Sequence, residues 1–253
     1  MAAEAHGEGG FDPLHQFQIE HWIPIHLGDV AISFTNSAAF MVAAVVLVIL
    51  FTTLTVRRRE LVPGRWQSLA EVAYEFVAGM VRDNVGHEGK PYFPFIFTLF
   101  MFILFCNMLG MLPYSFTVTS QIVVTFGLAV VVFIGVTIIG FIKHGFGFFG
   151  FFLPGGVPPF LAPLVIPIEV LSYLMRPVSL GLRLFANLTA GHTMLKVFAG
   201  FIISLGAFYV VPGAIPFSVV VALTILEFAI AFLQAYVFAV LACIYLHDAI
   251  HMH

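Results

Sequence analysis

The chain has 253 residues, of which 61% are hydrophobic and only 9% are charged, and its formal net charge is −3 at pH 7. A soluble domain carries about 25% charged residues, so the composition excludes an ordinary soluble protein and gives no sign of a nucleic-acid partner. It predicts an all-α polytopic membrane protein forming a single domain over residues 1–253, with room for about five transmembrane helices of about 20 residues each. The two cysteines, Cys106 and Cys243, lie in apolar stretches without metal-binding or redox spacing. We therefore expect no metal site and no cofactor.

Residues 1–33 are predicted to form an external amino-terminal segment. The first ten residues, MAAEAHGEGG, are acidic and rich in glycine. They lack the positively charged start that is typical of a signal peptide. Trp22 and the isoleucines around it then indicate a segment that lies at the membrane interface.

The middle of the chain, residues 34–163, is predicted to contain three membrane spans. Apolar stretches place these spans at Phe34–Val56, Pro94–Leu112 and Thr119–Ile142. Residues 145–163, GFGFFGFFLPGGVPPFLAP, are rich in glycine, proline and phenylalanine. They predict an apolar loop that re-enters the membrane interface.

Residues 60–87 have a different pattern from the spans around them. Leu69, Val72, Phe76 and Met80 recur at helical spacing and share one face of a segment that also carries polar residues. This pattern predicts an amphipathic helix that lies on the cytoplasmic surface of the membrane. Packing against a helix of a partner protein is equally consistent with the pattern.

The last part of the chain, residues 164–253, is predicted to form a long antiparallel hairpin of two tilted helices. A helix over Leu164–Phe208 would be about 67 Å long at 1.5 Å per residue, against a hydrocarbon core of about 30 Å. Pro177 and Gly191 indicate kinks only, so a tilt is favoured over a turn back. VVPGAIP at Val210–Pro216 predicts the turn, and Phe217–Leu246 predicts the last helix.

The distribution of lysine and arginine predicts the orientation. The opposite segments, residues 1–28, 113–118 and 210–216, contain neither residue type. By the positive-inside rule the amino terminus lies outside and the carboxy terminus lies in the cytoplasm. The basic residues that share the cytoplasmic side are Arg57, Arg58, Arg59, Arg65, Arg82, Lys90 and Lys143.

The first helix of the hairpin carries charges at membrane depth. Glu169, Arg176 and Arg183 are spaced by seven and therefore share a face, whereas His192 and Lys196 fall on the opposite side. A central arginine costs about 2.5–3.5 kcal/mol on insertion scales, so it needs a partner, a wet cavity or a function. Arg176 has two structural interpretations, which are snorkelling to the interface and pairing with Glu169.

The hairpin register predicts which polar residues meet. Pairing Arg183 with Gln234 and His192 with Glu227 centres the turn near position 209, close to the turn at Val210–Pro216. Glu227, Gln234 and Tyr245 also share one helical face. One register can therefore place Gln234 beside Arg183, and Glu227 beside His192, where the acid and the histidine can exchange a proton.

The sequence around these charges resembles a known family, subunit a of the rotary F-type ATP synthase. The motifs are PVSLGLRLFANLTAGH at Pro177–His192 and LEFAIAFLQAYVFAVL at Leu226–Leu241. DPLHQF near the amino terminus and YLHDAIH near the end extend the resemblance over most of the chain.

The resemblance implies a proton-translocating stator subunit with no catalytic activity of its own. Arg183 matches the family's essential arginine, which separates two half-channels that lead to the carboxylates of a c-subunit ring. Other implied partners are the peripheral-stalk b subunits, the rest of the F1Fo complex and the lipid membrane. The implied location is the bacterial inner membrane, or the mitochondrial inner membrane. Candidate proton-path residues are His192, Glu227, Asn187, Gln234, Glu169 and Tyr245.

A secondary ion transporter with a charged site at the membrane midplane is the alternative. Such transporters usually show two related halves with broken helices, and this chain shows no such repeat. A voltage sensor needs several closely spaced arginines, which spacing by seven does not provide. No G-x-S-x-G or H-E-x-x-H motif indicates an intramembrane enzyme.

Overall fold

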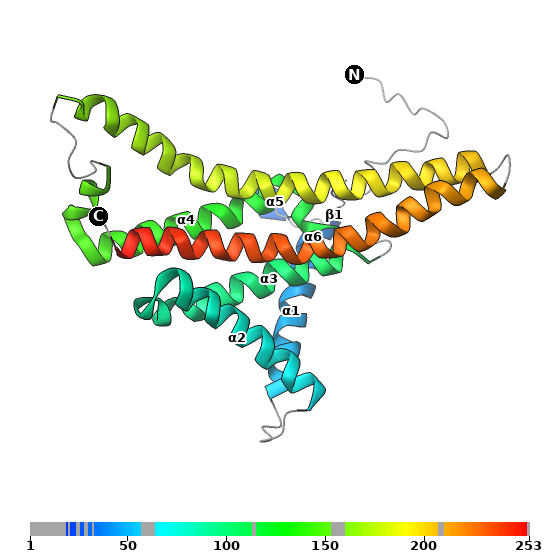
Figure 1. The fold of residues 1–253 in the computed structure, drawn as a ribbon, viewed down its shortest axis with the longest axis horizontal. Helices are drawn as coiled ribbons and strands as arrows, with labels where there is room; N and C mark the ends of the chain where they lie inside the picture. Colours follow the sequence, from blue (N-terminus) through cyan, green and yellow to red (C-terminus); the bar gives the residue numbers. More distant parts are fainter. Residues whose placement is uncertain are drawn as a thin grey trace.

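A computed structural model of the chain describes residues 19, 21–23, 26–27, 30–31, 33–56, 64–112, 115–152, 160–206 and 210–251 (Figure 1). Outside these residues lie most of the predicted external segment and part of the predicted loop at residues 145–163. Arg57, Arg58 and Arg59 lie outside them as well. Six α-helices make up the described fold, and five of its helical segments are long and apolar enough to cross a membrane. The prediction of an all-α polytopic protein with about five spans is confirmed. The α-helices are α1 (Asn36–Val56), α2 (Arg65–Val85), α3 (Phe93–Gly110), α4 (Ile122–His144), α5 (Ala162–Gly206) and α6 (Val210–Ile250).

Short elements connect or precede the helices. Four strands before α1 form two antiparallel pairs, β1 with β4 and β2 with β3. Among the described residues, one 3₁₀ helix follows α2, another precedes α4 and a third follows α4, where it belongs to the predicted re-entrant loop. These elements are β1 (His21–Ile23), β2 (His26–Leu27), β3 (Val30–Ala31), β4 (Phe34–Thr35), η2 (His87–Tyr92), η3 (Val118–Ser120) and η4 (Gly145–Phe152).

The two longest helices, α5 and α6, lie side by side as an antiparallel hairpin, with α1 running across their direction (Figure 1). They contain 45 and 41 residues, so each is about 60 Å or more in length at 1.5 Å per residue. α5 continues through Pro167 and Pro177. The prediction that Pro177 would not end the helix is therefore confirmed. Helices twice as long as the membrane is thick must lie obliquely in it.

The predicted turn at Val210–Pro216 is wrong, because α6 already begins at Val210. α5 ends at Gly206, so the connection precedes the VVPGAIP motif. The first backbone N–H groups of a helix have no intrahelical acceptor, and a proline within the first turn therefore costs no hydrogen bond. Pro212 meets this condition, and the motif is compatible with a helix start.

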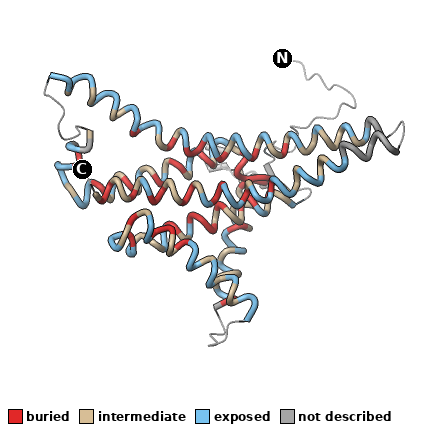
Figure 2. The backbone as a smooth tube through the Cα atoms, in the orientation of Figure 1, coloured by how far each residue is buried: buried red, intermediate tan, exposed pale blue. Residues whose placement is uncertain are grey.

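α6 is the central helix of the packed core, and it contacts α2, α3, α4 and α5. Buried residues are concentrated where the helices cross in the middle of the molecule, whereas the amino-terminal end of α5 is largely exposed (Figure 2). Ala231, Ala235 and Ala239 of α6 are completely buried. Small side chains let membrane helices approach closely, which explains how four helices pack around one.

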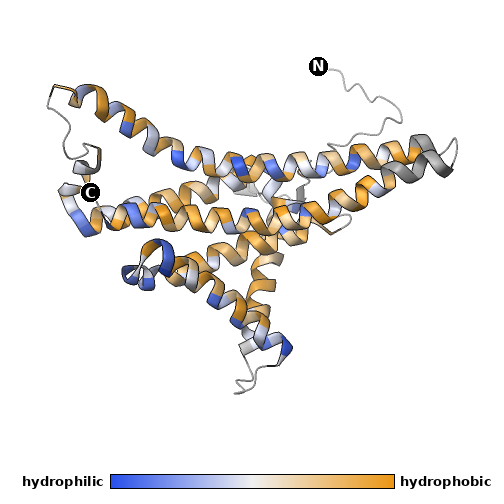
Figure 3. Ribbon diagram, in the orientation of Figure 1, coloured by the Kyte–Doolittle hydropathy of each residue, from blue (hydrophilic) through white to orange (hydrophobic). Residues whose placement is uncertain are grey.

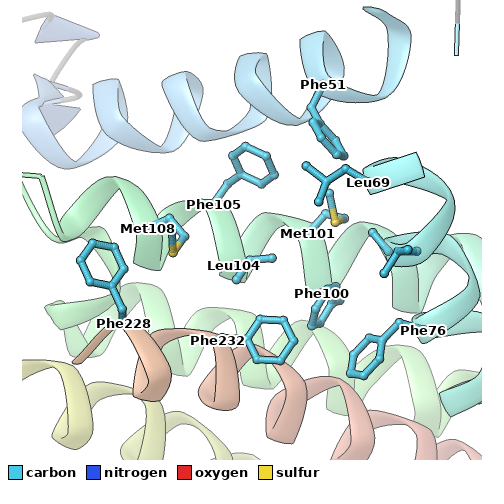
Figure 4. A pocket seen from close by; sticks show the side chains of 12 residues that line it. Phe51, Leu69, Phe76, Phe100, Met101, Leu104, Phe105, Met108, Phe228 and Phe232 are labelled. Carbon is cyan, nitrogen blue, oxygen red and sulfur yellow. The ribbon is translucent and has the colours of Figure 1, made fainter. Parts of the chain in front are cut away.

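The amphipathic helix predicted over residues 60–87 is α2, whose polar residues stand out among the apolar helices (Figure 3). Met80 is buried, but Leu69 and Phe76 line an apolar cavity of about 570 Å³ between α1, α2, α3 and α6 (Figure 4). The side chains that line it, drawn in Figure 4, consist of carbon and sulfur atoms only. A cavity of this kind has no groups that hold an ion, so the polar site must be sought elsewhere.

Candidate functional site: the polar residues of the α5–α6 hairpin

α5 has two faces of different character. Leu180, Leu184 and Leu188 recur every four residues and are buried against the core. Ser179, Arg183 and Asn187 recur with the same spacing on another side of the helix and are exposed. Helical periodicity therefore fixes Arg183 on a surface that the described part of the chain leaves uncovered.

Arg183 forms no ion pair and no hydrogen bond with the residues that the structure describes. Arg176, two helical turns earlier, is fully engaged. Its Nη1 atom lies 3.0 Å from Oδ2 of Asp248 on α6. Its guanidinium carbon lies 5.3 Å from the ring centroid of Tyr173 and 5.0 Å from that of Tyr245, within cation–π range. Of these two arginines on one helix, only Arg176 therefore has an acid partner among the described residues.

Asn187 and Gln234 connect the two helices next to Arg183. Asn187 Nδ2 donates a hydrogen bond of 3.0 Å to Oε1 of Gln234, which is buried. The sequence predicted that Gln234 would accept from Arg183, and no such bond forms among the described residues. Asn187 lies one turn further along the same face, and its short amide occupies the acceptor.

His192 and Glu227 meet across the hairpin, as the register predicted. His192 Nδ1 lies 3.9 Å from Oε2 of Glu227, and their residues are only 9% and 8% exposed. Oε2 of Glu227 has no hydrogen-bond partner within the described structure. The pair is therefore close but not hydrogen-bonded, a separation that a small movement or one water molecule can bridge.

Gly191 makes room for this acid. A Cβ atom at Gly191 would lie 2.6 Å from Oε1 and 3.2 Å from the carboxyl carbon of Glu227. Real Cβ atoms do not approach other atoms this closely, so any larger residue would displace the carboxylate. The absence of a side chain at Gly191 allows the acid of α6 to lie beside the histidine of α5.

The last two candidates, Glu169 and Tyr245, lie elsewhere. Tyr245 contacts Arg176, and half-buried Glu169 precedes Arg176 by two helical turns on α5. Glu169 forms no ion pair with Arg176 or with any other described residue, since the acid partner of Arg176 is Asp248. Polar groups therefore gather in two clusters on either side of Arg183, one around His192 and the other around Arg176.

Sequence reasoning missed two contributors to these clusters. One is Asp248, the acid that pairs with Arg176, which the sequence did not assign to that arginine. Thr117, which precedes η3, has its hydroxyl 3.3 Å from Nε2 of His192, although 75 positions separate the two residues. No periodic signal exists for a single threonine in a connecting segment, so only the tertiary structure reveals this contact.

The fold and these clusters define a class, the polytopic helical membrane proteins that carry ionisable groups within their spans. Ionisable residues at membrane depth are rare and usually functional. Within this class the chain belongs to the family described as ATP synthase A chain, whose sequence model matches residues 38–247. The resemblance predicted from the sequence is confirmed.

Individual relatives match over nearly the whole chain. The ATP synthase subunit a of Paramagnetospirillum magneticum is 60% identical over 245 residues, which cover 96% of this chain and 99% of the relative. The protein of the same name from Parvibaculum lavamentivorans is 56% identical over 248 residues, covering 96% and 95%. That from Rhodospirillum rubrum is 59% identical over 241 residues, covering 95% and 99%.

Proposed function

We propose that this chain is the proton-translocating stator subunit of an F-type ATP synthase. In this proposal it is a non-catalytic component that faces a ring of c subunits, each with a carboxylate in the membrane. One half-channel leads protons from outside to the ring, and a second half-channel leads them to the cytoplasm. Arg183 lies between the two half-channels.

The observation that carries the proposal is the contrast between Arg183 and Arg176. Arg176 has an acid and two aromatic rings, whereas Arg183 is exposed without an acid among the described residues. A cation inside an apolar helix needs a counter-charge, and here it has to come from another subunit. A carboxylate on a passing ring supplies that charge and is held in its ionised form by the arginine.

Arginine also suits the barrier between two half-channels. Its guanidinium keeps its charge when poorly solvated, so it does not relay protons itself. A fixed positive charge repels protons that would cross directly from one half-channel to the other. Each proton that passes through the ring instead uses the membrane potential, which contributes about 2.3 kcal/mol per charge per 100 mV.

The two polar clusters correspond to the two half-channels. We assign His192 and Glu227, with Asn187 and Gln234 nearby, to the outer half-channel, and Glu169 and Tyr245 to the cytoplasmic one. This assignment follows the predicted orientation, in which the amino terminus is outside and the carboxy terminus cytoplasmic. The same proposal places the protein in a bacterial inner membrane, in contact with peripheral-stalk b subunits and the rest of the F1Fo complex.

Disulfide cross-linking tests the ring-facing surface. Under oxidising conditions, cysteines replacing Ser179 and Asn187 should form disulfides with cysteines placed beside the membrane carboxylate of a small ring subunit. Leu54 of α1 is 62% exposed and lies on a different helix, so its cysteine variant is the control and should not capture the ring. Capture only of other subunits by the α5 cysteines would contradict the proposal. Proton transport by the purified chain alone in vesicles would favour a secondary transporter.

A further inference from the structure

Thr117 is a buried threonine whose hydroxyl contacts the histidine of the outer cluster. Oγ1 of Thr117 lies 3.3 Å from Nε2 of His192, and the residue is 5% exposed. Its carbonyl accepts hydrogen bonds from the hydroxyl and the backbone N–H of Ser120, at 2.6 and 3.1 Å. The segment that carries Thr117 is therefore fixed by its own hydrogen bonds.

Gly110, the last residue of α3, is what allows Thr117 to reach this position. A Cβ atom at Gly110 would lie 2.8 Å from Cγ2 and 3.0 Å from Oγ1 of Thr117. Thr117 belongs to a connecting segment, so a larger residue at position 110 would move the threonine away. The contact with His192 thus depends on a close approach that only glycine permits.

The hydrogen-bond partners of the hydroxyl determine its role toward the imidazole. A threonine hydroxyl has one proton, and we infer that Thr117 donates it to the carbonyl oxygen of Gly110, 3.4 Å away, because that oxygen can only accept. Its lone pairs then accept from Nε2–H of His192. In a neutral imidazole with its proton on Nε2, Nδ1 is unprotonated, and Nδ1 is the atom that faces Glu227.

We propose that Thr117 is a positioning residue that holds neutral His192 in the tautomer with the proton on Nε2. Nδ1 is then free to accept the proton of the Glu227 carboxyl group, which leaves a carboxylate and an imidazolium, and the reverse transfer restores both neutral groups. Without Thr117 the imidazole can turn or carry its proton on Nδ1, where it blocks this transfer. The inference rests on the proposed function, because it gives Thr117 a part in the outer proton path.

The first test reads the tautomer directly in the assembled ATP synthase. Solid-state nitrogen NMR of histidine-labelled complex in liposomes distinguishes protonated from bare ring nitrogens, and the signals that disappear in His192→Gln identify His192. We expect Nε2 protonated and Nδ1 bare in the native chain and in Thr117→Ser. Thr117→Val should lose this preference. An unchanged His192 spectrum in Thr117→Val would overturn the proposal.

Thr119 provides the matched control on the same short turn. The hydroxyl of Thr119 donates a hydrogen bond of 2.9 Å to Oδ1 of Asn107, and Thr119 is as deeply buried as Thr117. Thr119→Val should therefore leave the His192 spectrum unchanged, even if the complex becomes less stable. Gly110→Ala should reproduce the spectrum of Thr117→Val, because it displaces the threonine and leaves its hydroxyl intact.

The second test measures ATP-driven proton pumping per assembled complex. We expect a loss of roughly tenfold in Thr117→Val, comparable with the value of one hydrogen bond, and recovery in Thr117→Ser. A fall in pumping without a change of tautomer would make Thr117 merely structural and overturn the proposal, as would a changed tautomer with unchanged pumping. Full pumping by His192→Gln would instead contradict the proposed function, which assigns His192 to the outer half-channel. The tautomer measurement would still show whether Thr117 controls which nitrogen of His192 carries the proton.

Discussion

Arg176 of α5 and Asp248 of α6 form an ion pair of 3.0 Å that ties α5 to the carboxy-terminal end of α6. Their side chains are 23% and 32% exposed, so both charges are partly desolvated. Tyr173 and Tyr245 lie close to the guanidinium, and the hydroxyl of Tyr173 is 2.6 Å from that of Thr137 on α4. The pair therefore couples the packing of three helices.

Removing one partner of this pair should destabilise the protein more than reversing both charges. Asp248→Asn leaves the arginine partly buried without its acid, and the cost should be about 1–3 kcal/mol in the free energy of unfolding. Reversing both charges, with Arg176→Asp and Asp248→Arg, should restore part of that loss. Thermal unfolding of the purified variants in detergent measures this, and strictly additive effects would show that the two side chains are not coupled.

Arg183 should behave differently from Arg176. Arg183→Ala should abolish proton-coupled ATP synthesis and allow a passive proton leak, because the proposed barrier between the half-channels would be lost. Arg183→Lys should also fail, since a desolvated lysine can lose its proton and cannot form a forked contact with a carboxylate. Both quantities can be measured in membrane vesicles with an imposed proton gradient.

Arg176→Ala is the matched control for the loss of one arginine from α5. It should reduce the amount of stable subunit through the loss of the Asp248 pair, but vesicles corrected for that amount should not leak protons. Substantial coupled synthesis by Arg183→Lys, or an equal leak from both alanine variants, would contradict the role assigned to Arg183.

The sequence predicted the hairpin register to within one helical turn, because residue numbers in an antiparallel pair constrain one another. That constraint placed His192 beside Glu227, and it located the connection better than VVPGAIP did, since proline is compatible with both a turn and a helix start. The same constraint cannot distinguish residues one helical turn apart. It therefore predicted Arg183 beside Gln234, whereas the structure places Asn187 there.

Contacts made outside the hairpin were beyond prediction for a different reason. Thr117 reaches His192 because a connecting segment folds back over Gly110, and no periodicity in the sequence encodes that path. Within the hairpin, the aromatic surroundings of Arg176 depend on how α5 and α6 pack, and the register alone does not specify which charges find partners.

His192 and Glu227 should act as one unit in proton transfer. His192→Ala and Glu227→Gln should each slow ATP-driven proton pumping by roughly tenfold or more without preventing assembly. The exchange His192→Glu with Glu227→His keeps one acid and one base at the same place, so it should recover more activity than either half of the exchange. Additive losses in the double variant would show that the two residues do not share a site.

Gly191 should matter to transport although it carries no functional group. In Gly191→Ala the new methyl group would lie 2.6 Å from Oε1 of Glu227, so the carboxylate must move away from its present position beside His192. We expect a clear loss of ATP-driven pumping per assembled complex. Gly135 of α4 is the control, because a Cβ atom there meets nothing within 4 Å. Gly135→Ala should keep full pumping and add helix stability of up to about 1 kcal/mol. Equal pumping by the two alanine variants would show that the position of the Glu227 carboxylate does not limit proton transfer.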